Sequence, residues 1–365
     1  MRVLVDAVLG PSHPRGIGRY LNEIAAYGQR SGEADFTIAI APWHREFYSP
    51  LAAAGVELVE VRLGARRGLR NTWHAYGLGR LARSVNADVI HVPDRLPVIA
   101  SADRPLVITI HDTAEVDLPD AFGRLQLRYR RWVLFDQLRR ATRIITPSRF
   151  SAQRIASVNA AAATRTVVVS HGPGLDSTQA ERRPQARLSE QFVLFVGAVQ
   201  RHKAVPLLIR AFRDLNAGDV QLVIAGATHN DEASVTAAAG GDPRVVRLPD
   251  VSDDELAWLY RRAAVLAIPS RYEGFGIPLV EAMQFGCPVI AATAGAMPEI
   301  TGDAALLVPP DDQQALSGAL ARVLADDALR AQLIDAGRAR AASFSWQRAA
   351  HETIDVYRAA LATSR

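Results

Sequence analysis

Short apolar segments alternate with amphipathic segments along all 365 residues, and this alternation restricts the fold more than any other feature. Strands buried on both faces of a parallel sheet read as short apolar runs, and amphipathic helices connect them. The expected strands of the first half are 2–8, 36–40, 56–61, 88–91, 106–110, 143–145 and 166–169. Those of the second half are 192–197, 220–226, 245–248, 265–268, 288–291 and 305–308. The pattern therefore predicts an α/β fold with largely parallel sheets.

The apolar pattern is interrupted between the two halves. Residues 181–191 contain Arg-Arg-Pro and have no apolar period, which is typical of a linker. We therefore expect two Rossmann-like, doubly wound domains, 1–185 and 186–344, that face a central cleft at the carboxyl ends of their strands. The tail 345–365 is expected to form one helix, because these residues recur at helical spacing: Trp346, Ala349, Ala350, Thr353, Ile354, Tyr357 and Leu361.

Composition excludes several classes of protein. Hydrophobic residues make up 49% of the chain and charged residues 22%, which excludes a disordered protein. The single cysteine, Cys287, excludes a disulfide framework and a cysteine-based zinc site. No apolar run reaches the length of a membrane span. Asp6 interrupts the first apolar run too early for a signal peptide, so we expect a cytoplasmic protein.

Basic residues are distributed unevenly. Lys203 is the only lysine among 42 lysines and arginines. Seven arginines lie between Arg124 and Arg143, with Asp136 as the only acid among them. This run is either a solvated helix face or a contact with anionic lipid heads or an acidic acceptor, and a lipid contact would place the protein peripherally at the inner face of the membrane. No recognition motif accompanies the charge, so we expect no nucleic-acid partner.

The segment Ser270-Arg-Tyr-Glu-Gly-Phe-Gly-Ile-Pro-Leu-Val-Glu-Ala282 carries the strongest functional signal. A strand, a glycine-bearing loop and a helix follow one another there, with Pro278 in the first helical turn and Gly286 after the last. The helix N-terminus can bind a diphosphate. Glu273 on the loop and Glu281, expected in the first helical turn, can accept hydrogen bonds from sugar hydroxyls of one elongated ligand. A capped surface helix with an acid near its start is the alternative.

This segment resembles the E-x7-E motif of the family 4 glycosyltransferases, which are retaining enzymes of the GT-B fold that use nucleotide-sugar donors. Further stretches resemble the same family over nearly the whole chain, and two of them, 15–20 and 302–308, look most like bacterial mannosyltransferases that use GDP-mannose. UDP- or dTDP-sugars would fit the same two glutamates, because the ribose and the diphosphate are shared. The resemblance implies that the C-terminal helix crosses back to the first domain. The stretches that carry it are 15–20, 109–112, 145–151, 302–308 and 344–346.

The resemblance also implies roles for residues of the second domain. Glu281 would bind the ribose hydroxyls and Glu273 the transferred sugar, as a catalytic residue. Gly274, Phe275 and Gly276 would offer backbone N–H groups to the donor.

The loop after the strand 192–197 would bind the diphosphate. Lys203 matches the family's phosphate-binding, catalytic lysine. His202 stands where relatives usually have arginine, so Arg201, one residue earlier, is the candidate for the second donor-binding cation.

In the first domain, the resemblance implies that His111, at the end of a strand, is catalytic and contacts the donor sugar near the anomeric carbon. Asp112 could orient His111 or cap the next segment. Gly16 would lie in a glycine loop close to the diphosphate, although a tight turn would also explain Gly16-x-Gly18. We interpret His91, also at a strand end, as a hydrogen-bonded structural residue.

The resulting expectation is a glycosyltransferase that moves a sugar from a nucleotide-sugar donor, bound by the second domain, to a hydroxyl acceptor bound by the first. The acceptor could be a glycan, a lipid-linked sugar or a small metabolite. We expect no cofactor and no metal, since the chain lacks an Asp-x-Asp motif and paired histidine spacing. The alternatives are a nucleotide-sugar epimerase and a non-catalytic nucleotide-sugar-binding subunit.

Overall fold

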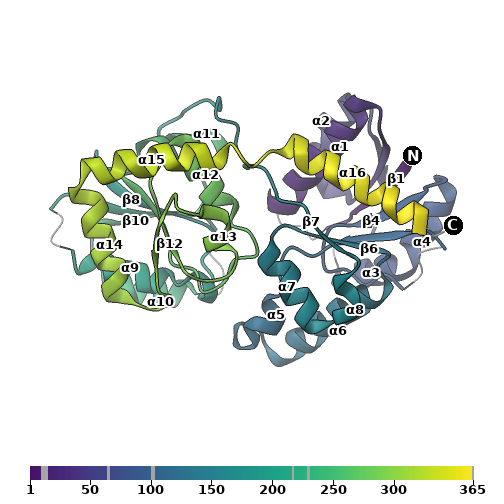
Figure 1. Cartoon of the computed structure of the whole chain (residues 1–365), viewed down its shortest axis with the longest axis horizontal. Helices are drawn as coiled ribbons and strands as arrows, with labels where there is room; N and C mark the ends of the chain where they lie inside the picture. The colour runs from purple at the N-terminus through teal and green to yellow at the C-terminus, as the bar shows by residue number, and fades with distance from the viewer. Residues whose placement is uncertain (10–14, 64–65, 100–102, 216–217, 228–230, 364–365) are drawn as a thin grey trace. The chain divides into compact units, whose positions relative to one another are not determined.

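The computed structural model describes residues 1–9, 15–63, 66–99, 103–215, 218–227 and 231–363. The chain forms two compact units (Figure 1). The first consists of Met1–His171 together with Ser345–Arg365, and the second of Gly172–Phe344. Each is a parallel α/β unit and is described below by itself.

The first unit is built on a seven-stranded sheet in the order β3-β2-β1-β4-β5-β6-β7. Every recorded pairing in it is parallel. The strand order reverses between β1 and β4, and ligands of such sheets bind at the carboxyl ends of the strands beside that reversal. The strands are β1 (Arg2–Ala7), β2 (Asp35–Ile40), β3 (Glu57–Glu60), β4 (Val89–Val92), β5 (Leu106–Thr109), β6 (Arg143–Thr146) and β7 (Thr166–Val168).

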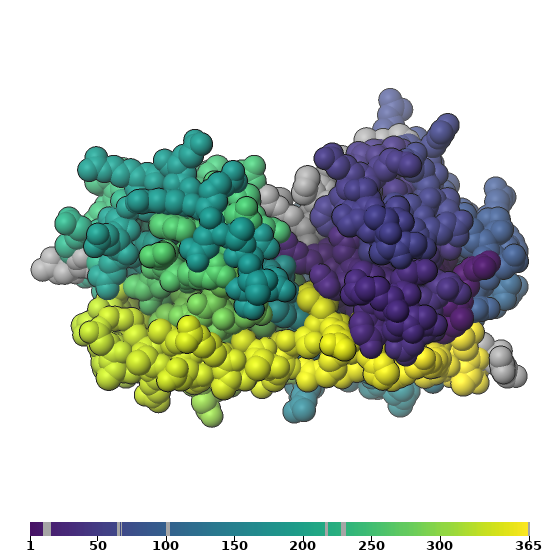
Figure 2. Space-filling view, turned by 90° about the horizontal axis from the view of Figure 1, so that it is seen from above, coloured from purple at the N-terminus to yellow at the C-terminus, as the bar shows by residue number. Residues whose placement is uncertain are grey.

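Helices cover this sheet, and the C-terminal helix α16 (Trp346–Thr363) is one of them. It packs on α1 and against β4, β5 and β6. Ala349, Ile354 and Tyr357 are fully buried in that contact. Figure 2 shows α16, in yellow, lying against the purple N-terminal segment. The other helices of the unit are α1 (Arg15–Ser31), η1 (Pro42–His44), α2 (Arg45–Ala53), α3 (Arg67–Thr72), η2 (Trp73–Gly77), α4 (Leu78–Ser84), α5 (Ala114–Asp117), η3 (Pro119–Ala121), α6 (Arg124–Arg140), α7 (Arg149–Val158) and α8 (Ala160–Ala163).

The second unit repeats the same architecture around a six-stranded parallel sheet in the order β10-β9-β8-β11-β12-β13. Its strands are β8 (Phe192–Val196), β9 (Gln221–Ala225), β10 (Val245–Leu248), β11 (Val265–Ile268), β12 (Val289–Ala292) and β13 (Leu306–Val308). Its helices are η4 (Arg201–Lys203), α9 (Val205–Arg213), α10 (Glu232–Ala239), α11 (Asp253–Arg262), α12 (Ile277–Phe285), α13 (Met297–Thr301), α14 (Gln313–Ala325) and α15 (Asp327–Ala341).

All thirteen expected strands are present, each within two residues of its expected limits. The division between the units differs from the expectation, because it falls at His171 rather than after residue 185. The segment that follows His171 is held by α11 of the second unit: the Arg182 N–H donates to the Asp254 carbonyl at 3.2 Å, and Arg261 donates to the Gln179 carbonyl at 3.1 Å. Polar composition indicated a linker at 181–191, but the whole of this segment belongs to the second unit.

Candidate functional site

The loop after β8 presents Lys203 at the start of α9. Val199 N–H donates to the Ala227 carbonyl at 2.9 Å, which fixes this loop against the one that follows β9. Gly226 has φ +136°, and a Cβ there would lie 2.3 Å from the Gly197 carbonyl oxygen, so the two backbones meet closely. The short helix η4 then ends at Lys203, and Ala204, in the left-handed region at φ +53°, begins α9.

Lys203 forms an ion pair with Glu273. Its Nζ lies 2.6 Å from Oε1 and 2.8 Å from Oε2 of that carboxylate. The two side chains are 20% and 13% exposed, so solvent reaches both. β8 and β11 are neighbours in the sheet, and the loops that follow them therefore meet. The structure thus brings together the expected phosphate-binding lysine and the expected sugar-binding glutamate, in contact with each other.

Arg271 holds the lysine loop in place. Its backbone N–H donates to the His202 carbonyl at 2.7 Å, and its Nη1 donates to the Arg201 carbonyl at 3.2 Å. Its Nε donates to Asp311 at 2.7 Å, so Arg271 connects three loops at the same sheet edge. The sequence analysis did not select Arg271, although its position two residues before Glu273 could have identified it as part of the site. The Arg201 side chain is exposed, with no hydrogen bond recorded among the described residues, so its expected contact with the diphosphate stays a prediction.

Glu273 is fixed by a third loop. Ala296 N–H donates to the Glu273 carbonyl at 2.9 Å. A Cβ on Gly295 would lie 2.5 Å from the Glu273 carbonyl oxygen, and Gly295 has φ +59°, so only glycine fits there. Phe275, whose backbone was expected at the donor, buries its ring edge-on against Phe344 with centroids 5.6 Å apart.

Helix α12 has the expected Pro278 in its first turn, but Glu281 lies deeper than expected. Gly276 at φ +96° is the N-cap, and Gly286 at φ +73° is the C-cap. Because the helix starts at Ile277, Glu281 is one turn further in, and the expectation that it lies in the first turn was wrong. Its side chain is only 4% exposed. The buried Tyr260 hydroxyl of α11 donates to its Oε2 at 2.7 Å and orients the carboxylate, a partner that sequence analysis did not identify.

In the first unit, His111 follows β5 and is held at both ring nitrogens. Its Nε2 lies 2.9 Å from the Pro93 carbonyl and its Nδ1 lies 3.2 Å from His171 Nε2. A carbonyl can only accept, so His111 carries its proton on Nε2 and accepts from His171 on Nδ1. Burial lowers the pKa of both histidines. His111 is therefore a neutral imidazole at physiological pH.

An aromatic cluster supports His111. The Tyr20 ring lies edge-on to it with centroids 5.6 Å apart. Trp346, at the start of α16, stacks on His171 at 5.4 Å. The contact between His171 and Trp346 could not be predicted from a local motif, because 175 positions separate the two residues in the chain.

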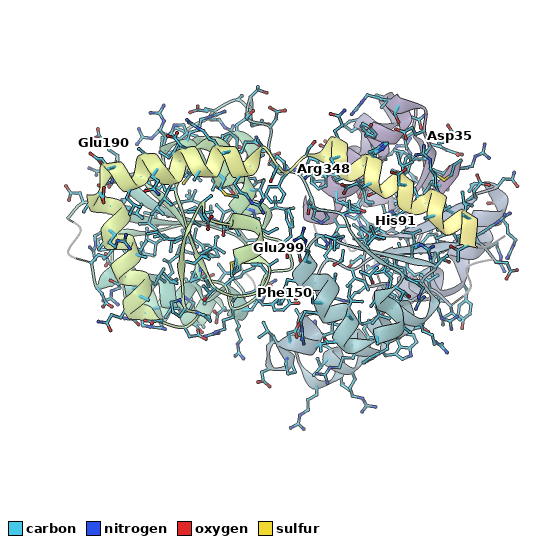
Figure 3. The ribbon with its side chains drawn as sticks, viewed as in Figure 1. Asp35, His91, Phe150, Glu190, Glu299 and Arg348 are labelled. Atoms are coloured by element: carbon cyan, nitrogen blue, oxygen red, sulfur yellow. The ribbon has the colours of Figure 1, made fainter. Side chains whose placement is uncertain are left out.

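His91 and Asp112 have structural roles. His91 lies beside α16 (Figure 3), is fully buried, and places its ring nitrogens 2.8 Å from Thr109 Oγ1 and from the Tyr357 hydroxyl. Burial lowers its pKa to about 3, which agrees with the structural interpretation. Asp112 accepts from the Ala114 N–H at 3.0 Å and pairs with Arg95 at 2.9 Å. Burial alone would raise the pKa of Asp112, but Arg95 holds it well below the usual range. Asp112 thus caps the next segment, whereas His171 and Pro93 hold the His111 ring.

Gly16 lies in the first turn of α1 and not in a loop, so the expectation of a glycine loop at this position was wrong. Its φ is not positive, and a Cβ there would meet nothing within 4 Å. The expected contact between Gly16 and the diphosphate stays a prediction.

Within the described ranges, no cluster of three histidine, cysteine or acidic side chains could hold a metal ion. In the same ranges, no helix is long and apolar enough to cross a membrane.

Comparison with known proteins identifies the family. The model for Glycosyltransferase Family 4 matches residues 14–176, and that for Glycosyl transferases group 1 matches residues 176–340. O-antigen chain mannosyltransferase B of Escherichia coli is 30% identical over 265 residues, which are 69% of this chain and 70% of that protein. This chain belongs to glycosyltransferase family 4.

A second relative supports the same assignment. The MMP alpha-(1->4)-mannosyltransferase of Mycolicibacterium hassiacum is 33% identical over 295 residues, covering 75% of this chain and 71% of that protein. The resemblance in the sequence is therefore confirmed.

Solved structures show the GT-B fold. Sucrose-phosphate synthase from Thermosynechococcus elongatus matches with a TM-score of 0.76 at 22% identity, over all of both chains. HepE of Anabaena, solved with UDP and glucose, matches with a TM-score of 0.75 at 20% identity, over 98% of this chain and all of that one. The chain is a glycosyltransferase with two parallel α/β domains of this fold.

Proposed function

We propose that this family 4 glycosyltransferase retains the anomeric configuration and transfers mannose from GDP-mannose to a hydroxyl group of a glycan, a lipid-linked sugar or a small metabolite. The observation that carries the proposal is the Lys203–Glu273 ion pair, whose ammonium and carboxylate lie 2.6 Å apart at the start of α9. Two relatives are named mannosyltransferases, which supports mannose as the transferred sugar.

The ion pair suits a donor with a diphosphate and a sugar. A phosphate oxygen can compete with Glu273 for the Lys203 ammonium, since both are anionic acceptors. The Glu273 carboxylate is then free to accept hydrogen bonds from hydroxyl groups of the transferred sugar. Glu281, oriented by the Tyr260 hydroxyl at 2.7 Å, accepts from the ribose hydroxyls. One donor would thus contact two carboxylates and one ammonium in the second unit.

The reaction breaks the bond between the anomeric carbon and the phosphate oxygen. The acceptor oxygen forms its bond to the same face of that carbon, and its proton passes to the departing phosphate oxygen. Negative charge grows on the diphosphate, and Lys203 stabilises it by a charge-assisted contact. His111 contacts the sugar near the anomeric carbon as a neutral imidazole, because burial lowers its pKa.

We further propose that no metal and no cofactor takes part. Lys203 and Arg201 of η4, together with the N-terminus of α9, would neutralise the diphosphate. A protein that uses these groups keeps its activity in a chelator. Activity that disappears with the chelator and returns with Mg²⁺ or Mn²⁺ would contradict this part of the proposal.

A thermal-shift panel of GDP-, UDP-, dTDP- and ADP-sugars tests the donor, since a ligand that binds the folded state raises the midpoint of unfolding. We expect the largest shift with GDP-mannose, and a larger shift with another nucleotide-sugar would reassign the donor. Transfer assays with the donor so identified separate the alternatives. An epimerase converts the donor without any acceptor, and a binding subunit shifts the midpoint but consumes no donor.

A further inference from the structure

The outer face of α6 carries apolar and basic side chains in one stripe. Leu125, Arg128, Trp132, Phe135 and Arg139 are all exposed and follow one another at intervals of three or four residues. At 3.6 residues per turn, such intervals place side chains along one face of a helix. Leu125 is 82% exposed, Trp132 48% and Phe135 49%. We call these five residues the α6 stripe.

The stripe is not needed to fold the helix. The opposite face of α6 is buried through Val133, Leu134 and Leu138, each fully inaccessible. Figure 1 places α6 at the outer edge of the first unit, and Figure 3 shows long side chains that end in nitrogen projecting outward there. The exposed apolar area is therefore not explained by packing within the first unit.

The charges on this helix are divided between its faces. Arg130 and Arg131 both contact Glu115 on the inner side. Arg130 forms an ion pair with its carboxylate at 3.5 Å, and Arg131 Nε donates to its backbone carbonyl at 3.0 Å. Asp136 is 9% exposed and pairs with Arg139 at 3.0 Å and with Arg140. No ion pair is recorded for Arg124 or Arg128 in the described part of the chain, and both are exposed. The outward side of α6 therefore presents cations and no exposed acid.

Further exposed apolar side chains lie on segments that hydrogen bonds join to α6. The Arg140 Nη1 donates to the Ile99 carbonyl at 3.2 Å, and the Ile99 N–H donates to the Ala75 carbonyl at 3.1 Å. Next to Ala75, Tyr76 is 57% exposed. Of the eight large hydrophobic side chains exposed in the described ranges, six lie on α6, at Ile99 or on the segment α3–η2. Most of the large apolar side chains exposed in the described ranges thus lie in the first unit, three of them on the α6 stripe itself, and an exposed apolar cluster of this kind is typical of an interaction surface.

We propose that the α6 stripe docks on the surface of an anionic phospholipid bilayer. Trp and Phe rings and a Leu side chain enter the boundary between head groups and acyl chains, and the arginines contact lipid phosphates. A second copy fits poorly, since pairing the stripe with itself brings two sets of arginines together and offers no exposed acid to either. Nucleic acid would use the arginines and the aromatic rings, but it offers nothing to the aliphatic Leu125. The inference is independent of the donor.

Sedimentation of the full chain with phospholipid vesicles tests the proposal. We expect binding to phosphatidylcholine vesicles that contain phosphatidylglycerol, no binding to pure phosphatidylcholine, and loss of binding at high salt. Replacing Arg124 and Arg128 by glutamine should weaken binding about fivefold for each arginine. The variant L125S/W132S/F135S should lose binding at least as strongly, because the apolar contact is removed. A matched control, L307S with R187Q, makes the same kinds of change on exposed side chains of the second unit and should bind like the unchanged chain.

Three results would overturn the proposal. The unchanged chain could fail to bind anionic vesicles even at low salt, or both the glutamine variant and the serine variant could bind as it does. Sedimentation velocity could also show a dimer that the serine variant converts to a monomer, which would assign the stripe to a second copy. Thermal midpoints equal to that of the unchanged chain confirm that each variant is folded. The glutamine variant keeps the test decisive if the serine variant does not fold.

Discussion

Replacement of Lys203 is the change that most sharply tests the role of the ion pair. Lys203 is the only lysine in a chain with 41 arginines, so arginine is accepted at every other basic position. Its ammonium lies 2.6 and 2.8 Å from the two oxygens of Glu273 and is 20% exposed. The backbone that carries Lys203 is held in place, because Arg271 bonds to the Arg201 carbonyl of η4 and Ala204 turns the chain into α9.

The expected loss in Lys203→Ala has two parts. Removing one group that stabilises transition-state charge costs about 3–4 kcal/mol, which is two to three orders of magnitude in kcat/KM. Removing the partner of Glu273 costs stability as well. Because both side chains are partly exposed, that cost lies between a surface and a buried pair, at about 1–2 kcal/mol of unfolding free energy. The loss in rate should therefore exceed the loss in stability.

Lys203→Arg separates charge from shape. A guanidinium is a wide planar fork, whereas an ammonium is a compact point charge, so the arginine variant should recover only part of the activity. Both variants are measured by steady-state kinetics with the donor from the thermal-shift panel, and their unfolding by urea is measured in parallel. Full activity of Lys203→Arg would show that charge alone matters. Full activity of Lys203→Ala would remove the ion pair from the mechanism.

Four further predictions follow from the same geometry. Glu281→Ala should weaken nucleotide binding in calorimetry by about 1.5–3 kcal/mol, and Tyr260→Phe by about 1 kcal/mol through lost orientation; unchanged binding in both would exclude Glu281 from the donor site. Glu273→Ala should reduce turnover more than it reduces affinity for free nucleoside diphosphate, and equal losses would contradict its assignment to the sugar. Arg271→Ala should raise KM for the donor severalfold with little change in thermal midpoint, whereas Arg330→Ala, which removes another surface arginine–aspartate pair, should leave KM unchanged. His91 has a pKa of about 3 in the folded state, whereas in the unfolded state it binds a proton below about pH 6.5. The unfolding free energy should therefore fall as the pH drops from about 6.5 to 3. In His91→Gln, urea unfolding should show a smaller fall over the same pH range.

The fold could be predicted from the sequence because the inner strands of both sheets are buried on both faces. Val193, Leu194 and Phe195 of β8 are fully inaccessible, and such runs carry the apolar signal whatever their neighbours are. Pro278 and Gly286 likewise marked the ends of α12, because their backbone requirements are local. The first turn of α1 was misjudged at Gly16, since a glycine pair is compatible with a turn as well as with a helix start.

The contacts within the site depend on topology and could not be derived from spacing. Lys203 meets Glu273 because β8 and β11 pair at the point where the strand order reverses, 70 residues apart. Tyr260 reaches Glu281 because α11 and α12 pack together. The residue types alone do not predict either contact. The expected roles of Gly274 and Arg201 stay predictions, since they concern a donor.

Proton NMR of donor hydrolysis tests the central claim most directly. GDP-mannose is incubated with the protein and no acceptor, so that water takes the place of the acceptor hydroxyl, and the anomeric signals are followed from the first turnovers. The account predicts that free mannose appears first as the α anomer, with the configuration of the donor, and that Lys203→Ala slows its appearance by about two to three orders of magnitude. Initial release of the β anomer would show inversion, and an epimerised nucleotide-sugar would show a different reaction. Donor that binds but is consumed neither by water nor in the transfer assays with acceptors would contradict catalysis altogether.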